Sequence, residues 1–181
     1  RQSEKMAQLG TLTAGVAHEL NNPAAAVKRG AAQLEETQLA YGEAQARLAQ
    51  AGLSSAQQAS LNELVNQARV LARRPLDLDA LSRSDREFAL EEWLDSHNVE
   101  DAWELAPMLV NLGYAADQLA ELVRLFDVRQ LPPVVTWLGA TYTVYNLLAE
   151  VSQGAARISE IVKALKSYVY LDQAPVQSVD I

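Results

Sequence analysis

Two stretches of the sequence, one toward each end, carry mostly apolar or small residues at intervals of three and four, and in the second stretch the two intervals alternate strictly. This spacing keeps one stripe of a helix facing a partner helix, so it predicts long helices packed side by side. In the N-terminal stretch the stripe consists of Leu9, Thr13, Val16, Leu20, Ala24, Val27, Ala31, Leu34, Gln38, Tyr41 and Leu48. In the C-terminal stretch it consists of Val144, Leu148, Val151, Ala155, Ile158, Val162, Leu165 and Val169.

The first helix is expected to run from about Ser3 to about Gln50, where Gly52 favours a helix end. At ~1.5 Å per residue it would be roughly 70 Å long, which is too long for its own small domain to cover. It therefore requires partner helices. Pro132 and Pro133 suit the first turn of the second helix, which is expected to end at about Asp172.

The middle of the chain, residues 53–130, is predicted to form a cluster of short helices. Ser55 with Gln58, and Ser84 with Glu87, have the spacing of capping boxes that open helices. The fold class that follows is all-α. Two long helices, residues 1–52 and residues 131–172, form a hairpin into which a small helical subdomain is inserted.

Within this insertion, Pro107 suits the first turn of a helix, Gly113 suits a helix end, and a further helix is expected at about Ala116 to Phe126. His97 falls in an expected turn between helices with no organised partner, which gives it no predicted function. Aromatic residues at helical spacing indicate a core or the lining of a small pocket: Phe88, Trp93, Trp103, Tyr114 and Phe126.

The composition excludes several classes of function. The net charge of −8 argues against a nucleic-acid partner, because binding to phosphates needs a basic surface. The chain has no cysteine and two distant histidines, so no metal-ligand spacing is present, and a reducing cytoplasm is compatible. No apolar run is long enough to span a membrane. The first residue is Arg1 and the last Ile181, which indicates a piece of a longer protein.

The chemistry is concentrated in the stretch Ala17-His18-Glu19-Leu20-Asn21-Asn22-Pro23. A neutral imidazole nitrogen is a good nucleophile near neutral pH, so His18 is suited to accepting a phosphoryl group. The Glu19 carboxylate is placed to bond the other ring nitrogen and to fix the tautomer. Pro23 has no N–H, which leaves the carbonyl of Glu19 without its helical partner and permits a bend.

The whole stretch from Gly10 to Pro23 closely resembles the H-box of sensor histidine kinases, particularly those similar to nitrogen-regulation kinases. The resemblance implies a hairpin that dimerises into a four-helix bundle. It implies that His18 accepts the γ-phosphoryl group of ATP and passes it to an aspartate of a response regulator. It also implies that Glu19 assists as acid or base, and that Asn22 positions water for dephosphorylation.

The segment Ala156 to Leu165 resembles the second bundle helix of that family, and residues 173–181 resemble a linker and the start of its ATP-binding domain. ATP and magnesium would belong to that domain, so no cofactor is expected in this chain, which should be inactive alone. The implied partners are a second copy, the response regulator and the ATP-binding domain. The implied location is the cytoplasm, even where the parent protein is tethered to a membrane.

Two departures from the family pattern stand out. Ala24-Ala25-Ala26 follows the proline where the family commonly has leucine, and the insertion between the helices is unusually long. The insertion is either a stiffening decoration or a sensory or docking module. Two rival functions also stay open, namely a monomeric histidine phosphotransfer carrier and a structural signalling coiled coil in which His18 is incidental.

Overall fold

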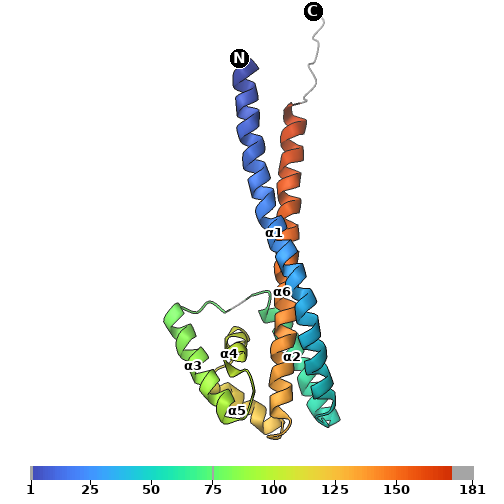
Figure 1. The fold of residues 1–181 in the computed structure, drawn as a ribbon, viewed down its shortest axis with the longest axis vertical. Helices are drawn as coiled ribbons and strands as arrows, with labels where there is room; N and C mark the ends of the chain where they lie inside the picture. Colours follow the sequence, from blue (N-terminus) through green and yellow to red (C-terminus); the bar gives the residue numbers. More distant parts are fainter. Residues whose placement is uncertain (1, 75, 173–181) are drawn as a thin grey trace, which may run out of the picture. The chain divides into compact units, whose positions relative to one another are not determined.

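Helices are the only regular secondary structure in the described part of the chain. The computed structural model describes the backbone of residues 2–74 and 76–172 and the side chains of residues 15–74 and 76–167. Residues 173–181, with the predicted start of an ATP-binding domain, lie outside the described residues. The helices are α1 Gln2–Ala49, α2 Ser55–Leu71, α3 Ala80–Ser96, α4 Ala102–Asn111, α5 Ala116–Leu125 and α6 Leu131–Asp172 (Figure 1). The predicted all-α class is therefore confirmed.

The chain forms two compact units. Among the described residues, one unit comprises residues 2–31 and 150–172, and the other comprises residues 32–74 and 76–149. The N-terminal part of α1 and the C-terminal part of α6 make up the helical hairpin of the first unit, which we call the hairpin unit. The second unit, which we call the helical subdomain, holds the rest of these two helices together with α2, α3, α4 and α5.

Glycines and prolines end and begin the long helices where the sequence predicts. Gly52, just past the end of α1, has a φ of 65°, a left-handed conformation that glycine adopts at little cost. Gly113 plays the same part after α4, with a φ of 83°. Pro132 and Pro133 occupy the first turn of α6. Pro107, in contrast, lies inside α4 and not in its first turn, because α4 already begins at Ala102.

The helix starts differ from the sequence prediction in a way that capping chemistry explains. The capping box of α2 is formed by Ser54 and Gln57, one residue ahead of the predicted pair. Their backbone N–H groups donate to each other's side chains, over 2.9 Å to the Gln57 amide oxygen and 3.3 Å to the Ser54 hydroxyl. The Gln57 amide nitrogen also donates to the carbonyl of Leu125 at 2.9 Å. This bond favours the capping box of Ser54 and Gln57 over the predicted pair.

The start of α3 also corrects a prediction. Ser84 and Glu87 lie within the helix, and Asp79 caps it at Ala80. The Asp79 carboxylate accepts from the Ser82 hydroxyl at 2.6 Å and from the Ser82 N–H at 2.9 Å. These two bonds favour the charged form and lower the pKa of Asp79. Aspartate is among the strongest N-capping residues, so the helix begins a turn earlier than expected.

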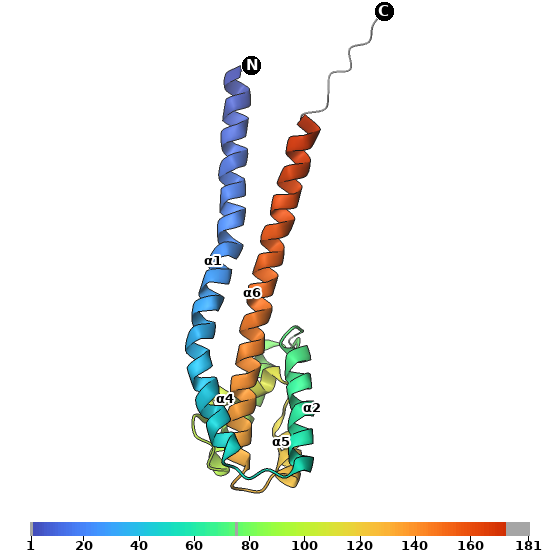
Figure 2. The same cartoon turned by 90° about the vertical axis from the view of Figure 1, so that its right-hand side faces the viewer.

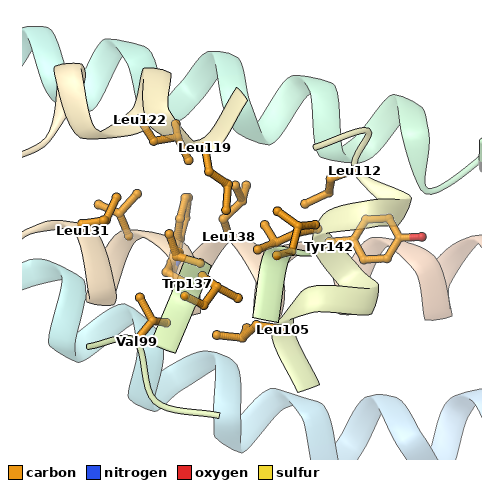
Figure 3. Packing of buried hydrophobic residues seen from close by; sticks show 14 of the residues in the cluster. Val99, Leu105, Leu112, Leu119, Leu122, Leu131, Trp137, Leu138 and Tyr142 are labelled. Carbon is orange, nitrogen blue, oxygen red and sulfur yellow. The ribbon is translucent and has the colours of Figure 1, made fainter. Parts of the chain in front are cut away.

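The core of the helical subdomain surrounds the first half of α6. Gly139 is buried, and a Cβ atom there would lie 2.7 Å from the Leu105 side chain, so α4 approaches α6 closely. Figure 3 shows Leu105 in the same apolar cluster as Trp137 and Leu138. The largest fully buried side chains are Phe126, Leu90, Leu94, Leu109, Leu119, Leu131, Leu138, Val110, Val134 and Val135.

Gln130, a buried polar residue, ties three segments of the subdomain together. Its amide oxygen accepts from the Gln57 side chain at 2.7 Å and from the Asp127 N–H at 3.1 Å. Its amide nitrogen donates to the carbonyls of Ala51 at 3.2 Å and Gly52 at 3.4 Å. The turn after α1, the start of α2 and the turn before α6 are therefore linked through one side chain.

We expect Gln130→Leu to lower the free energy of unfolding by about 1–2 kcal/mol, because the part-buried hydrogen bonds of the Gln130 side chain are lost. The measurement is urea unfolding followed by circular dichroism. Gln67→Leu makes the same chemical change at an exposed position of α2 and should shift stability by less than about 0.5 kcal/mol. Equal stability of the two variants would contradict the structural role of Gln130.

Candidate functional site

His18 lies on α1 in the hairpin unit, with its side chain exposed to solvent. Asn22 is also exposed and, four residues further on, shares the face of the helix on which His18 lies. Glu19 is exposed too, but consecutive residues of a helix do not face each other. The Glu19 carboxylate therefore flanks the imidazole from a position about 100° around the helix.

The opposite side of α1 packs against α6 within the hairpin unit. The half-buried or buried positions of α1 in this unit are Val16, Leu20, Pro23, Val27 and Gly30, which alternate at intervals of three and four, together with Ala26. Those of α6 are Val151, Gly154, Ile158, Ile161 and Leu165. Figures 1 and 2 show these parts of α1, in blue, and α6, in red, running alongside each other. The packed stripe holds His18 on the outer face of the helix.

The two helices approach each other most closely beside the proline. A Cβ atom on Gly154 would lie 2.7 Å from a methyl group of Val27 and 3.2 Å from the carbonyl oxygen of Pro23. Gly154 is itself buried. Only glycine allows this approach without movement of the neighbours, which explains the glycine at this position in the interior of α6.

A groove connects Asn22 with α6. It has a volume of about 570 Å³, and its lining residues all belong to the hairpin unit: Asn22, Pro23, Ala26, Glu150, Gln153, Gly154, Ala156, Arg157 and Glu160. Arg157 and Glu160 form an exposed ion pair at 3.3 Å, one turn apart on α6. Such an exposed pair adds little stability, so both side chains are available to a partner.

Part of the predicted apolar stripe does not pack inside the hairpin. Ala24 and Ala31 on α1 are exposed, as are Ala155 and Val162 on α6, Val162 with 37% of its surface accessible. Of the stripe predicted from sequence, Val16, Leu20 and Val27 lie on the packed side of α1, whereas Ala24 and Ala31 are not covered within the hairpin. The physical reason is that a single hairpin buries only one edge of a wide apolar face.

His97 has organised partners, contrary to the sequence prediction. It caps the C-terminus of α3, and its ring stacks on Trp93 with the ring centroids 3.7 Å apart. Its Nδ1 atom lies 2.7 Å from the Trp93 carbonyl oxygen and 3.0 Å from the Ser96 hydroxyl. These contacts are local to the end of one helix, so His97 is a structural residue.

The predicted aromatic group of the insertion does not gather into one pocket. Phe88 and Trp103 are 69% and 65% exposed, whereas Phe126 is in the core. Among the residues that the structure describes, no group of three potential metal ligands comes together. The described helices include none that is both long and apolar enough to cross a membrane.

Comparisons of the chain with models of protein families, with curated protein sequences and with solved structures find no match.

Proposed function

We propose that this chain is the dimerisation and phosphoacceptor domain of a sensor histidine kinase, with His18 as the phosphorylated residue. The observation that carries the proposal is the placement of His18. The imidazole is exposed on the outer face of α1, whereas the opposite face of the helix packs against α6. His18 also lies about one turn before Pro23, at which the helix is able to bend. A fixed and accessible nucleophile is what attack on a nucleotide held by another domain requires.

The proposed reaction needs little covalent chemistry from this chain. A neutral ring nitrogen of His18 attacks the γ-phosphorus of ATP, the bond to the bridging oxygen of ADP breaks, and a phosphohistidine forms. Glu19 assists by accepting or returning the proton of the ring. ATP and magnesium are supplied by an ATP-binding domain, and the phosphoryl group then moves to an aspartate of a response regulator in the cytoplasm.

The groove beside Asn22 supports a role for this part of the hairpin unit in docking the response regulator. It runs from Asn22 and Pro23 to Arg157 and Glu160, so a regulator seated there would lie directly beyond His18. In the reverse reaction we propose that Asn22 positions the water that removes the phosphoryl group. Its place on the His18 face, one helical turn away, supports this role.

The exposed apolar residues of the hairpin unit support dimerisation into a four-helix bundle. Ala17, Ala24 and Ala31 recur on α1 at heptad spacing, as do Ala155 and Val162 on α6. A heptad-spaced apolar stripe that one hairpin leaves uncovered is the kind of surface that partner helices cover. We therefore propose that the unit is a homodimer through these stripes.

We expect Val162→Glu to convert the dimer to a monomer, because each protomer would bury an unpaired charge in the interface. The dissociation constant should rise at least about 100-fold. The measurement is light scattering after size exclusion over a range of concentrations. Ala164→Glu adds the same charge about 200° further around the helix and should leave the dimer intact. A wild-type chain that is monomeric would favour the rival phosphotransfer carrier.

The whole proposal is tested by incubating the longest natural polypeptide that contains this chain with magnesium and ATP labelled at its γ-phosphate. Acid-labile, base-stable label that maps to the peptide containing His18 is the expected result. The absence of label from a folded protein with a bound nucleotide would favour the second rival, a structural coiled coil.

A further inference from the structure

The helical subdomain contains a cleft that the proposed phosphotransfer does not use. It has a volume of about 680 Å³ and is lined by residues of α1, the beginning of α4 and the first half of α6. Small-molecule sites have volumes of roughly 300–1,000 Å³. The lining residues all belong to the helical subdomain and fall within residues 37–51, 98–108 and 129–143.

The floor of the cleft is apolar. Ala44 and Leu105 are buried, and Met108 and Ala140 are half-buried beside them. The alanines on α1 and α6 are small, and this leaves the space between the helices open. Methionine adapts its shape to an apolar partner, so this floor suits the hydrocarbon or aromatic body of a ligand.

The rim of the cleft carries an excess of negative charge. Its carboxylates are Glu43, Glu100, Asp101 and Glu104, and its cations are Arg47 and Arg129. Arg47 follows Glu43 at a distance of four residues on α1, the spacing at which the two charges offset each other. The wall formed by α4 and the residues before it has no basic side chain. With Arg47 offsetting Glu43, the three carboxylates of that wall outnumber the one remaining cation, Arg129, and the net charge there is negative.

Helix capping does not account for these carboxylates. Asp101 occupies the N-cap position of α4, yet its side chain makes no capping hydrogen bond, and its φ of 56° lies in the left-handed region. Glu100 precedes the helix. Only Glu104, in the first turn, has an evident role in offsetting the helix dipole. Glu100 and Asp101 are exposed at the mouth of the cleft.

We propose that this cleft binds a small organic cation with an apolar body, such as an aromatic or alkyl amine. The ammonium group pairs with the carboxylates of Glu100, Asp101 and Glu104, and the apolar body covers Leu105 and Met108. The charge of the wall selects against an organic anion of the same shape. This site does not involve His18, and it gives the helical subdomain a class of ligand.

Tryptamine and indole-3-acetate are suitable probes, because they share a ring system and carry opposite charges. Isothermal titration of the 181-residue chain should show saturable binding of one tryptamine, weakened by added salt. Indole-3-acetate should bind at least about tenfold more weakly. Equal binding of the two probes, or no binding of tryptamine, overturns the proposal.

Variants locate the binding in the cleft. Glu100→Gln combined with Glu104→Gln should weaken tryptamine binding about tenfold, since two exposed ion pairs are lost. Ala40→Leu, an exposed lining position, should weaken it by partly filling the cleft. Glu63→Gln removes one carboxylate from the exposed surface of α2, outside the cleft, and should leave the affinity unchanged. Unaltered binding by the double variant places tryptamine elsewhere and overturns the proposal.

Discussion

Replacement of His18 by glutamine is expected to abolish phosphorylation of this chain by ATP. Glutamine keeps a polar side chain of similar length on the exposed face of α1 but has no nucleophilic nitrogen at neutral pH. The packed side of the helix is untouched, so folding and dimerisation should be unchanged. The measurement is the incorporation of acid-labile label from ATP into the natural polypeptide that contains this chain.

The second histidine provides a matched control for this loss. His97→Gln removes the ring that stacks on Trp93 and the contact of its Nδ1 atom with the Trp93 carbonyl, so a modest loss of stability is expected. Label incorporation should persist, because His97 lies in the helical subdomain at the end of α3. Full labelling of the His18→Gln variant would show that another residue is the phosphoacceptor.

The helices were predictable because local signals agree along them. Sustained apolar spacing marks α1 and α6, and Gly52, Pro132 and Pro133 mark the end of α1 and the start of α6. The helix starts in the insertion were less predictable, since several residues there are able to cap. Ser54 and Ser55 are each able to begin a capping box, and the hydrogen bond from the Gln57 side chain to the distant Leu125 carbonyl favours the one at Ser54. Sequence alone does not contain that contact.

The residues of the candidate site could be chosen from the sequence, but their surroundings could not be predicted. His18, Glu19 and Asn22 stand out from the sequence as a motif. The groove that Asn22 shares with Arg157 and Glu160 depends on the register between α1 and α6, which no local pattern specifies. The apolar face of α6 is also wider than one partner helix needs. For that reason the spacing did not distinguish Gly154 and Ile161, which are buried, from Ala155 and Val162, which are exposed.

Gly154 is the position at which a single methyl group should have the largest effect on the hairpin unit. A new Cβ would press against Val27, a β-branched residue with little rotational freedom, and against the carbonyl oxygen of Pro23. Neither neighbour is able to move aside without a shift of the backbone. We therefore expect Gly154→Ala to lower the free energy of unfolding by about 1–3 kcal/mol, although alanine is the better helix former.

The control is Gly42→Ala, because nothing lies within 4 Å of a Cβ at that exposed position of α1. There alanine should raise stability by about 0.5–1 kcal/mol through its lower conformational entropy in the unfolded chain. Urea unfolding measures both effects, and hydrogen exchange should place the loss in Gly154→Ala at the amides around Val27. Because this close approach lies beside Pro23, the same variant should also change the rate at which His18 is labelled. If Gly154→Ala stabilises the chain as much as Gly42→Ala does, the two helices are further apart than the structure has them.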